Sequence, residues 1–193
     1  LSRPFARGQR LEVLVEAGVL HPGVLPVFRS DRDDPDSPPV HPHRHQSEAV
    51  DHILGTGGDG GHNVVVATGT GSGKSFAFGI PIVSEALHMH DRGIPGIKAV
   101  IVYPMNALAN SQYDDFARRL HGSGLTLARY TGDTAHGPEE ALDRYQRATG
   151  RRQPFDCEVL SRQEIQDRPP DILMTNYVML ELLLTRFRDR TLF

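Results

Sequence analysis

The glycine-rich stretch at residues 68–75, Thr-Gly-Thr-Gly-Ser-Gly-Lys-Ser, constrains this chain more than any other feature. It follows an apolar run at 63–67 and precedes a helical pattern that opens at Lys74. Glycines allow backbone N–H groups to approach phosphate oxygens closely, because no Cβ stands in the way. The N-terminus of the following helix adds unpaired N–H groups and a positive dipole end. A buried strand, a glycine-rich turn and a helix together predict a phosphate-binding loop.

The last two residues of this loop have separate expected roles. Lys74 is expected to reach the β- and γ-phosphates of a nucleotide, and the Ser75 hydroxyl is expected to ligate Mg²⁺. The usual pattern starts with glycine, whereas this loop starts with Thr68. The alternative is a glycine-rich loop that ends in Lys-Ser by coincidence, and the agreement of strand, loop and helix argues against it. The predicted nucleotide-binding residues of the loop are Thr68, Gly69, Thr70, Gly71, Ser72, Gly73, Lys74 and Ser75, with Lys74 and Ser75 as the catalytic pair.

Composition sets the class of protein. The chain has 193 residues, 38% apolar and 23% charged, which suits one soluble globular domain with a small extension. No apolar run reaches the roughly 18 residues of a membrane span. The start has neither an initiator Met nor a signal peptide, so the chain is expected to be cut from a longer protein. The net charge of −3 provides no global basic field, so any nucleic-acid surface must be local. The single cysteine, Cys157, excludes an internal disulfide and favours a cytoplasmic location.

Strand and helix patterns alternate along most of the chain. Residues 1–40 are expected to form an N-terminal extension and a linker, and residues 41–193 the main domain. Besides 63–67, strands are expected at 98–103, 125–130 and 171–175; helices are expected at 47–54, 74–91, 104–120 and 138–148, and from Asn176 onward. Residues 137–168 are polar and charged, and indicate an insertion or a mobile surface segment. The alternation predicts an α/β fold with a parallel sheet and helices on both faces.

A histidine-rich segment precedes the first helix of the main domain. His41, His43 and His45 alternate and raise the possibility of a metal site, but no cysteine and no second ligand cluster supports it. Gln46 follows them, some twenty residues before the phosphate loop. A glutamine amide can both donate to and accept from an adenine edge, so Gln46 is a candidate nucleotide-binding residue. The alternative is an ordinary polar first turn of a helix.

Five segments resemble motifs of the superfamily 2 helicases, and in particular the first RecA-like domain of DEAD/DEAH-box proteins. Their order along the chain and their places at strand ends both fit that family. In chain order they resemble the Q motif (44–46), motif I (67–75), motif Ia (103–112), the glycine-containing element (130–134) and motif Ib (170–177). The amino-acid sequences of motifs Ia and Ib are most similar to those of large bacterial helicases, including the helicases of DISARM-type phage defence. The resemblance implies a RecA-like P-loop NTPase fold that is incomplete at the C-terminus.

The resemblance also implies ligands and roles. ATP and Mg²⁺ are the expected cofactors, with the adenine near Gln46. A single nucleic-acid strand, DNA in the first instance, would lie along the carboxyl ends of the strands. The residues implied in that track are Pro104, Asn106, Thr131, Gly132, Thr175 and Asn176. For Asn106, Thr175 and Asn176 the alternative is a plain helix cap, which is compatible with backbone contact.

The expected function is that of the N-terminal part of an ATP-dependent DNA helicase or translocase. An RNA helicase and a nucleotide-dependent binding module without hydrolysis are the alternatives. No Asp-Glu-x-His or Asp-Glu-x-Asp sequence follows the strand at 171–175. The family's Mg²⁺-holding Asp, its water-activating Glu and a second RecA-like domain are therefore expected elsewhere, and this fragment alone is expected to hydrolyse ATP negligibly. Protein partners in a defence or repair complex, but no membrane, complete the expectation.

Overall fold

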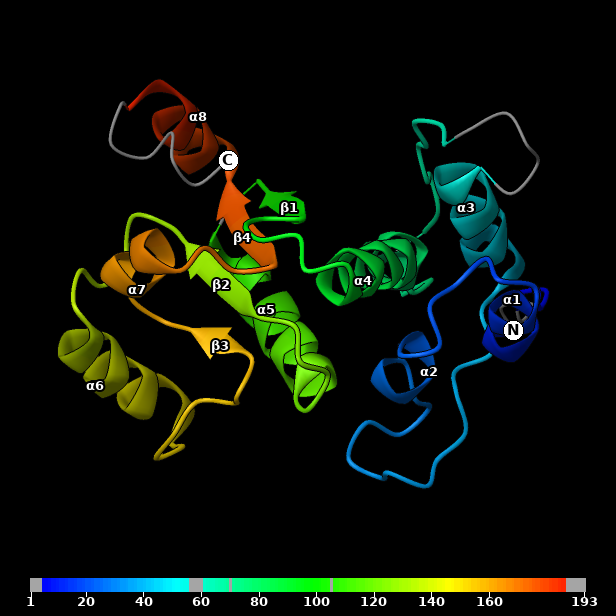
Figure 1. Cartoon of the computed structure of the whole chain (residues 1–193), viewed down its shortest axis with the longest axis horizontal. Coiled ribbons are helices and arrows are strands. Elements are labelled where there is room, and N and C mark those ends of the chain that lie inside the picture. Colours follow the sequence, from blue (N-terminus) through cyan, green and yellow to red (C-terminus); the bar gives the residue numbers. More distant parts are fainter. Residues whose placement is uncertain (1–4, 56–60, 70, 105, 187–193) are drawn as a thin grey trace. The chain divides into compact units, whose positions relative to one another are not determined.

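The computed structural model describes residues 5–55, 61–69, 71–104 and 106–186 (Figure 1). Two compact units make up the chain, Leu1–His88 and Met89–Phe193. The elements in chain order are α1 (Leu11–Glu16), α2 (Val24–Val27), α3 (Arg44–Leu54), α4 (Lys74–Asp91), β1 (Ala99–Tyr103), α5 (Asn106–Leu120), β2 (Leu127–Tyr130), α6 (Pro138–Thr149), β3 (Glu158–Val159), α7 (Arg162–Asp167), β4 (Ile172–Asn176) and α8 (Tyr177–Thr185). In the described residues, no helix is long and apolar enough to cross a membrane.

A four-stranded parallel sheet forms the centre of the second unit, in the order β1-β4-β2-β3. Strand β4 lies between β1 and β2 and pairs with both. Ile172 lies opposite both Ala99 and Leu127, and the last β1 pair joins Tyr103 to Asn176. The carboxyl ends of β1, β4 and β2 therefore meet at one edge of the sheet, as parallel pairing requires.

Helices cover both faces of this sheet, as expected from the sequence. Alternate residues of a strand point to opposite faces, so paired residues sort into two sets. One face packs against α7 and α8 in a cluster formed by Ala128, Tyr130, Ile165, Leu173, Met179 and Leu183. The other face carries Arg129, whose guanidinium lies 5.5 Å from the ring of Tyr113 on α5. The α/β fold with a parallel sheet is therefore confirmed.

The first strand expected from the sequence is not formed. Residues 61–69 have no regular secondary structure, and the side chain of Val65 is 93% exposed. A β-strand is stable only when its N–H and C=O groups pair with a neighbour, and no described strand pairs with residues 63–67. Three consecutive valines favour an extended chain but supply no partner, so this prediction is wrong for the structure described here.

The other strands and long helices lie where the sequence predicts them, within a few residues. Helix α3 starts at Arg44, earlier than the expected 47. The short helix α2 was not predicted, and neither were the short elements β3 and α7. Both β3 and α7 lie within residues 137–168, and β3 pairs with β2, so this polar segment contributes a strand to the sheet.

A buried ion pair joins the starts of three strands. Lys98 Nζ lies 2.6 Å from Asp171 Oδ1, and both side chains are more than nine-tenths buried. The second carboxylate oxygen of Asp171 accepts hydrogen bonds from the N–H and the hydroxyl of Thr126. Lys98 precedes β1, Thr126 precedes β2 and Asp171 precedes β4. This contact fixes the register of the sheet at the edge opposite to the one that carries the helicase-like motifs.

The first unit packs its helices around a separate apolar core. Leu11 of α1, Val24 of α2 and Ile80 of α4 are fully buried. The ring of Phe28 meets that of Phe76 edge-on at 5.7 Å between centroids. This packing holds α4, and with it the loop that precedes α4, against the N-terminal helices.

Candidate functional site

The phosphate loop is closed by its own hydrogen bonds. Lys74 Nζ donates to the carbonyl oxygens of Thr68 at 2.8 Å and Gly69 at 2.9 Å. The hydroxyls of Thr68 and Ser72 lie 2.6 Å apart, so the threonine that replaces the usual glycine is integrated into the loop. Gly71 and Gly73 have positive φ values of 80° and 70°, which favour glycine. Helix α4 begins at Lys74, as predicted, and Thr70 lies outside the described residues.

Gln46 holds this loop from helix α3. Its side chain is 2% exposed, and its Nε2 donates to the carbonyl oxygens of Gly73 at 2.7 Å and Ser72 at 3.2 Å. Its Oε1 accepts from the N–H of His43 at 2.6 Å. Both amide protons are therefore used within the protein, and Oε1 keeps one lone pair. An adenine placed at this residue would therefore find one acceptor position, on Oε1, and no remaining amide proton.

Two aromatic residues beside Gln46 were not predicted as part of the site. His45 Nε2 lies 3.1 Å from the carbonyl oxygen of Ser72, so a second side chain of α3 contacts the loop. Phe5 lies with its ring centroid 5.3 Å from those of both His43 and His45, and it is 46% exposed. Sequence spacing gave no signal for Phe5, because it lies some forty residues before Gln46.

The alternating histidines make contacts within the protein. His41 Nε2 bonds to the carbonyl oxygen of Gly8 at 2.9 Å, and the rings of His43 and His45 stack at 5.8 Å. Burial, with the nearby Arg7 charge, lowers the pKa of His43, which keeps this ring neutral at pH 7. Within the described part of the chain, no three His, Cys, Asp or Glu side chains are arranged to hold a metal ion.

The predicted nucleic-acid track falls at the carboxyl ends of three adjacent strands. Pro104 follows β1, Thr131 and Gly132 follow β2, and Asn176 ends β4. Since β1 pairs with β4 and β4 with β2, the structure brings these residues to one edge of the sheet. Pro104 and Gly132 are exposed there. Asn106 begins α5, and its side chain lies outside the described residues.

Two of the predicted track residues have structural roles. Asn176 Oδ1 accepts from the N–H of Met179 at 2.9 Å and caps α8, which is the alternative that the sequence had left open. Thr175 is 2% exposed, and its hydroxyl donates to the carbonyl oxygen of Tyr130 at 2.7 Å. Thr175 therefore ties β4 to the end of β2 and presents little surface to a ligand.

A cavity of about 530 Å³ lies among α5, α6 and the strands β2 and β3. The turn after β2 forms part of its wall, through Asp133 and Thr134. Four arginines line it together with three carboxylates; the arginines are Arg118, Arg129, Arg144 and Arg151. The sequence did not predict this cavity, because its walls come from segments far apart in the chain.

A glycine-rich loop at a helix N-terminus, next in sequence to a parallel α/β sheet with polar motifs at its carboxyl edge, defines the class of P-loop nucleotide-binding domains. A profile described as DEAD/DEAH box helicase matches residues 43–187. The chain belongs to the DEAD/DEAH box helicase family.

The chain is similar in sequence to parts of several larger proteins. Druantia protein DruE of Escherichia coli (strain UMEA 4076-1) is 28% identical in a match that covers 79% of this chain and 12% of DruE. ATP-dependent RNA helicase DBP3 of Phaeosphaeria nodorum is 38% identical over 84 residues, which are 44% of this chain and 14% of DBP3. "Probable ATP-dependent DNA helicase HFM1" of Xenopus tropicalis is 33% identical over 91 residues, 46% of this chain and 6% of that protein. The matches thus span a small part of each relative's length.

Proposed function

We propose that this chain is the ATP-binding part of a larger ATP-dependent DNA helicase or translocase. The observation that carries the proposal is the arrangement at the sheet edge, where the ends of motifs Ia and Ib and of the glycine-containing element come together. A strand of nucleic acid needs a continuous row of such sites, whereas a small-molecule kinase has no need of it. The short coverage of DruE, 12% of its length, supports a larger whole.

In this proposal the loop at 68–75 holds the phosphates of ATP. Gly69 and Gly71 have open space where a Cβ would lie, which leaves room for a ligand to approach the backbone. Lys74 Nζ would leave the carbonyl oxygens of Thr68 and Gly69 for the β- and γ-phosphates. Ser75, in the first turn of α4, would ligate the Mg²⁺ that accompanies ATP and offsets its charge. Gln46 would keep the loop in place and accept one hydrogen bond from adenine.

The test is the ATPase of the complete protein, with and without single-stranded DNA. We expect strand-dependent stimulation, and its loss with Lys74→Ala. Lys74→Arg keeps the charge but changes the shape of the donor group, so it tests whether charge alone supports the stimulation. If Lys74→Ala leaves the DNA-stimulated ATPase activity unchanged, the proposal is wrong.

An RNA helicase is the second candidate, favoured by the similarity to RNA helicase DBP3. Strand displacement on DNA and RNA duplexes of the same sequence separates the two. If the protein displaces strands only from RNA duplexes, it is an RNA helicase and the DNA part of the proposal is wrong. Strand binding that depends on ATP without any hydrolysis would instead favour a binding module. Co-purification from the native host tests the further expectation of protein partners in a defence or repair complex.

A further inference from the structure

Three consecutive carbonyl oxygens of the turn after β2 are held by arginine side chains. Arg162 Nη2 donates to the carbonyl oxygens of Thr131 at 3.1 Å and Gly132 at 3.0 Å. Arg144 Nη1 donates to the carbonyl oxygen of Asp133 at 2.7 Å. Hydrogen bonds from a charged donor are about twice as strong as neutral ones, so these three contacts fix the backbone of the turn.

The turn uses the N–H groups of its first and last residues within the protein, and that of Thr131 donates to Thr134 Oγ1 at 2.8 Å. The N–H of Thr134 donates to the carbonyl oxygen of Thr131 at 3.2 Å, which closes a β-turn with Gly132 and Asp133 at its centre. In the described part of the chain, no hydrogen bond uses the N–H of Gly132 or of Asp133. Both residues are exposed. Successive N–H groups in a turn form a concavity that suits an anion.

Contacts with neighbouring residues hold Arg162 beside this turn. The guanidinium carbon of Arg162 lies 5.2 Å from the centroid of the Tyr130 ring. The backbone N–H of Arg162 donates to the carbonyl oxygen of Ala135 at 2.9 Å. Its Nε is buried and has no hydrogen-bond partner in the described residues. Leaving a buried donor unpaired costs about 1–3 kcal/mol, so the cation–π contact and the two carbonyl bonds must offset that cost.

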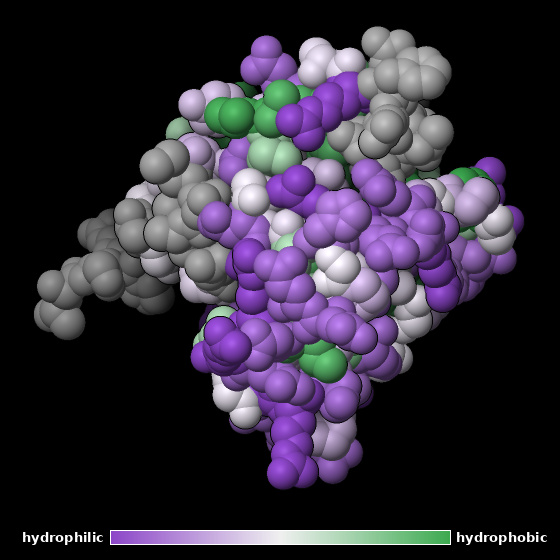
Figure 2. Space-filling view, turned by 90° about the vertical axis from the view of Figure 1, so that its left-hand side faces the viewer, coloured by the Kyte–Doolittle hydropathy of each residue, from purple (hydrophilic) through white to green (hydrophobic). Residues whose placement is uncertain are grey.

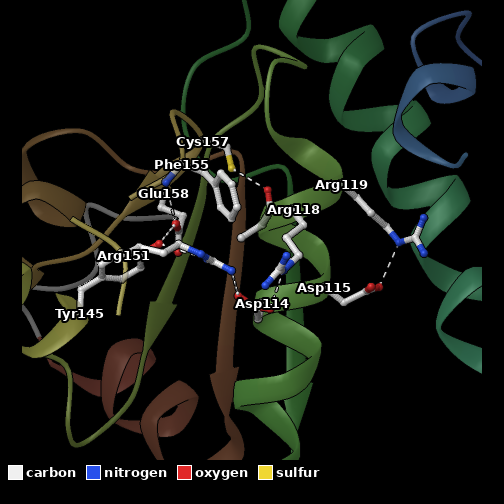
Figure 3. A network of polar contacts seen from close by, with 10 residues as sticks. Asp114, Asp115, Arg118, Arg119, Tyr145, Arg151, Phe155, Cys157 and Glu158 are labelled. Carbon is white, nitrogen blue, oxygen red and sulfur yellow. Dashed lines mark hydrogen bonds and ion pairs between the residues drawn. The ribbon is translucent and has the colours of Figure 1, made fainter. Parts of the chain in front are cut away.

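Arg144 is positioned by helix α6, which is anchored to the sheet domain by a polar network (Figure 3). Arg151 Nη2, just after α6, lies 2.9 Å from Asp114 Oδ1 of α5. The hydroxyl of Tyr145 on α6 donates to Glu158 of β3 at 2.8 Å. Cys157 is buried, its thiol donates to the carbonyl oxygen of Ala117, and burial raises its pKa to about 12, so it packs as a neutral group. The segment 137–168 is therefore tied to the helix and strands beside the turn.

The side of the molecule that carries α6 and α7 is largely hydrophilic (Figure 2). A buried apolar partner is therefore a poor match for it. The charges beside the turn balance: Arg162 and Arg144 stand against the carboxylates of Asp133 and of Glu140, which pairs with Arg144 at 2.6 Å. A phosphate that approaches the N–H groups of Gly132 and Asp133 therefore meets no net negative charge there.

We propose that Arg144 and Arg162 are positioning residues for nucleic-acid binding: they hold the carbonyl oxygens of residues 131–133 so that the N–H groups of Gly132 and Asp133 meet a backbone phosphate. The inference rests on the proposed function and adds a role for the polar segment. It predicts that these arginines act through the turn and make no contact with phosphate themselves.

The experiment measures the strand concentration that gives half-maximal ATPase stimulation in the complete protein. Arg162→Gln removes two carbonyl contacts and is expected to raise this concentration by about thirtyfold, and Arg144→Gln, which removes one, by about fivefold, since a net hydrogen bond contributes about 1 kcal/mol. ATPase without strand and the rate at saturating strand should stay unchanged. Arg162→Lys, which keeps the charge and a single donor group, should fall between Arg162→Gln and the unaltered protein.

The chain offers matched controls. Arg147 lies on α6 in an i,i+4 ion pair with Asp143, just as Arg144 pairs with Glu140, but Arg147 is 78% exposed and makes no contact with the turn. Arg168, the C-cap of α7, serves the same purpose for Arg162. If Arg144→Gln and Arg162→Gln behave like Arg147→Gln and Arg168→Gln, the inference is overturned.

Salt dependence separates positioning from direct contact. An arginine bound to phosphate contributes about 0.7 to the slope of log affinity against log salt concentration for a single strand. We expect the slope of both variants to equal that of the unaltered protein, and a slope reduced by that amount would overturn positioning in favour of direct contact. If Arg162→Gln does not fold, Arg162→Lys decides, because a half-maximal concentration equal to that of the unaltered protein would contradict the role. If no strand stimulates the unaltered protein, the proposed function fails, and the inference fails with it.

Discussion

Gly73 is the residue of the phosphate loop where a side chain is least tolerated. A Cβ at this position would lie 2.6 Å from Gln46 Nε2, and its φ of +70° disfavours any other residue. Gly73→Ala should lower the free energy of unfolding by about 1–3 kcal/mol and weaken nucleotide binding, because Gln46 must move. Thermal unfolding and ATP titration measure both effects.

Gly69→Ala is the matched control for Gly73→Ala. Gly69 lies in the same loop, has no positive φ, and has open space around the Cβ position. We expect its melting temperature to match that of the unaltered chain. Equal destabilisation by the two substitutions would contradict the contact between Gln46 and the loop.

At the scale of single residues, the sequence predicts what local patterns encode. A helix cap at Asn176, before an apolar helical run, was the alternative to strand contact that the sequence left open, and the structure has this cap. The phosphate loop could be predicted because its motif is defined by the order of its glycines and Lys74 along the sequence. The contacts of Arg144 and Arg162 with the turn after β2 could not be predicted, because an arginine in a polar segment most often lies on the solvated surface. Their carbonyl partners lie 11 to 31 residues away, and only the fold brings them together.

The buried pair of Lys98 and Asp171 controls the start of the sheet. Asp171→Asn keeps the shape of the side chain but leaves the Lys98 ammonium, 4% exposed, without its counter-charge. Removal of one partner of a buried pair costs about 3–5 kcal/mol, so we expect a loss of that size in urea unfolding. Asp167→Asn, an exposed carboxylate at the end of α7, is the control and should change the free energy of unfolding little. A small loss for Asp171→Asn would argue that the pair does not hold the strands.

Helix α5 and residue 151 are joined by an acid-sensitive contact. Burial raises the pKa of Asp114, but hydrogen bonds from Arg118 and Arg151 outweigh that effect and hold the pKa below its ordinary value. A lowered pKa stabilises the folded state above the ordinary value of about 4, and that contribution is lost as the pH falls through the folded value. Asp114 is 41% exposed, so the contribution at pH 7 is about 1 kcal/mol or less.

Asp114→Asn should therefore reduce stability at pH 7 and have progressively less effect below about pH 4. Urea unfolding across this pH range measures the difference. Asp143→Asn, which breaks the exposed pair with Arg147, should show almost no effect at either pH. A loss that is the same at all pH values would indicate that packing, and not charge, is responsible.

At the level of elements, long patterns were predictable and short ones were not. Helix α4 and strands β1 and β4 have apolar runs that identify them without a partner. Strand β3 has two residues, which is too short for any period, and it exists because β2 offers an edge. The expected strand at 63–67 is the converse case, because its valines fit a strand but find no pairing edge among the described strands.

Over the whole molecule, apolar side chains remain exposed at several separate places. Val65 is 93% exposed within three consecutive valines, and Tyr177 and Leu184 of α8 are 63% and 54% exposed. An unpaired β-branched run favours association between chains. Val65→Thr should therefore reduce self-association of the 193-residue chain, measured by sedimentation velocity. Val13→Thr, at an isolated position that is 48% exposed, should not, and an equal effect of both would contradict this explanation.

The arginines that hold the turn after β2 contact main-chain oxygens, which are the same at every amino acid. The exposed side chain at position 133 can therefore change over evolution while the carbonyl beneath it stays in place. The two distant arginines have less freedom, because a shorter or neutral side chain would lose the charged hydrogen bonds to the three carbonyl oxygens. Among divergent relatives, a pair of arginines after the second strand would be a more durable signature than the letters Thr-Gly-Asp.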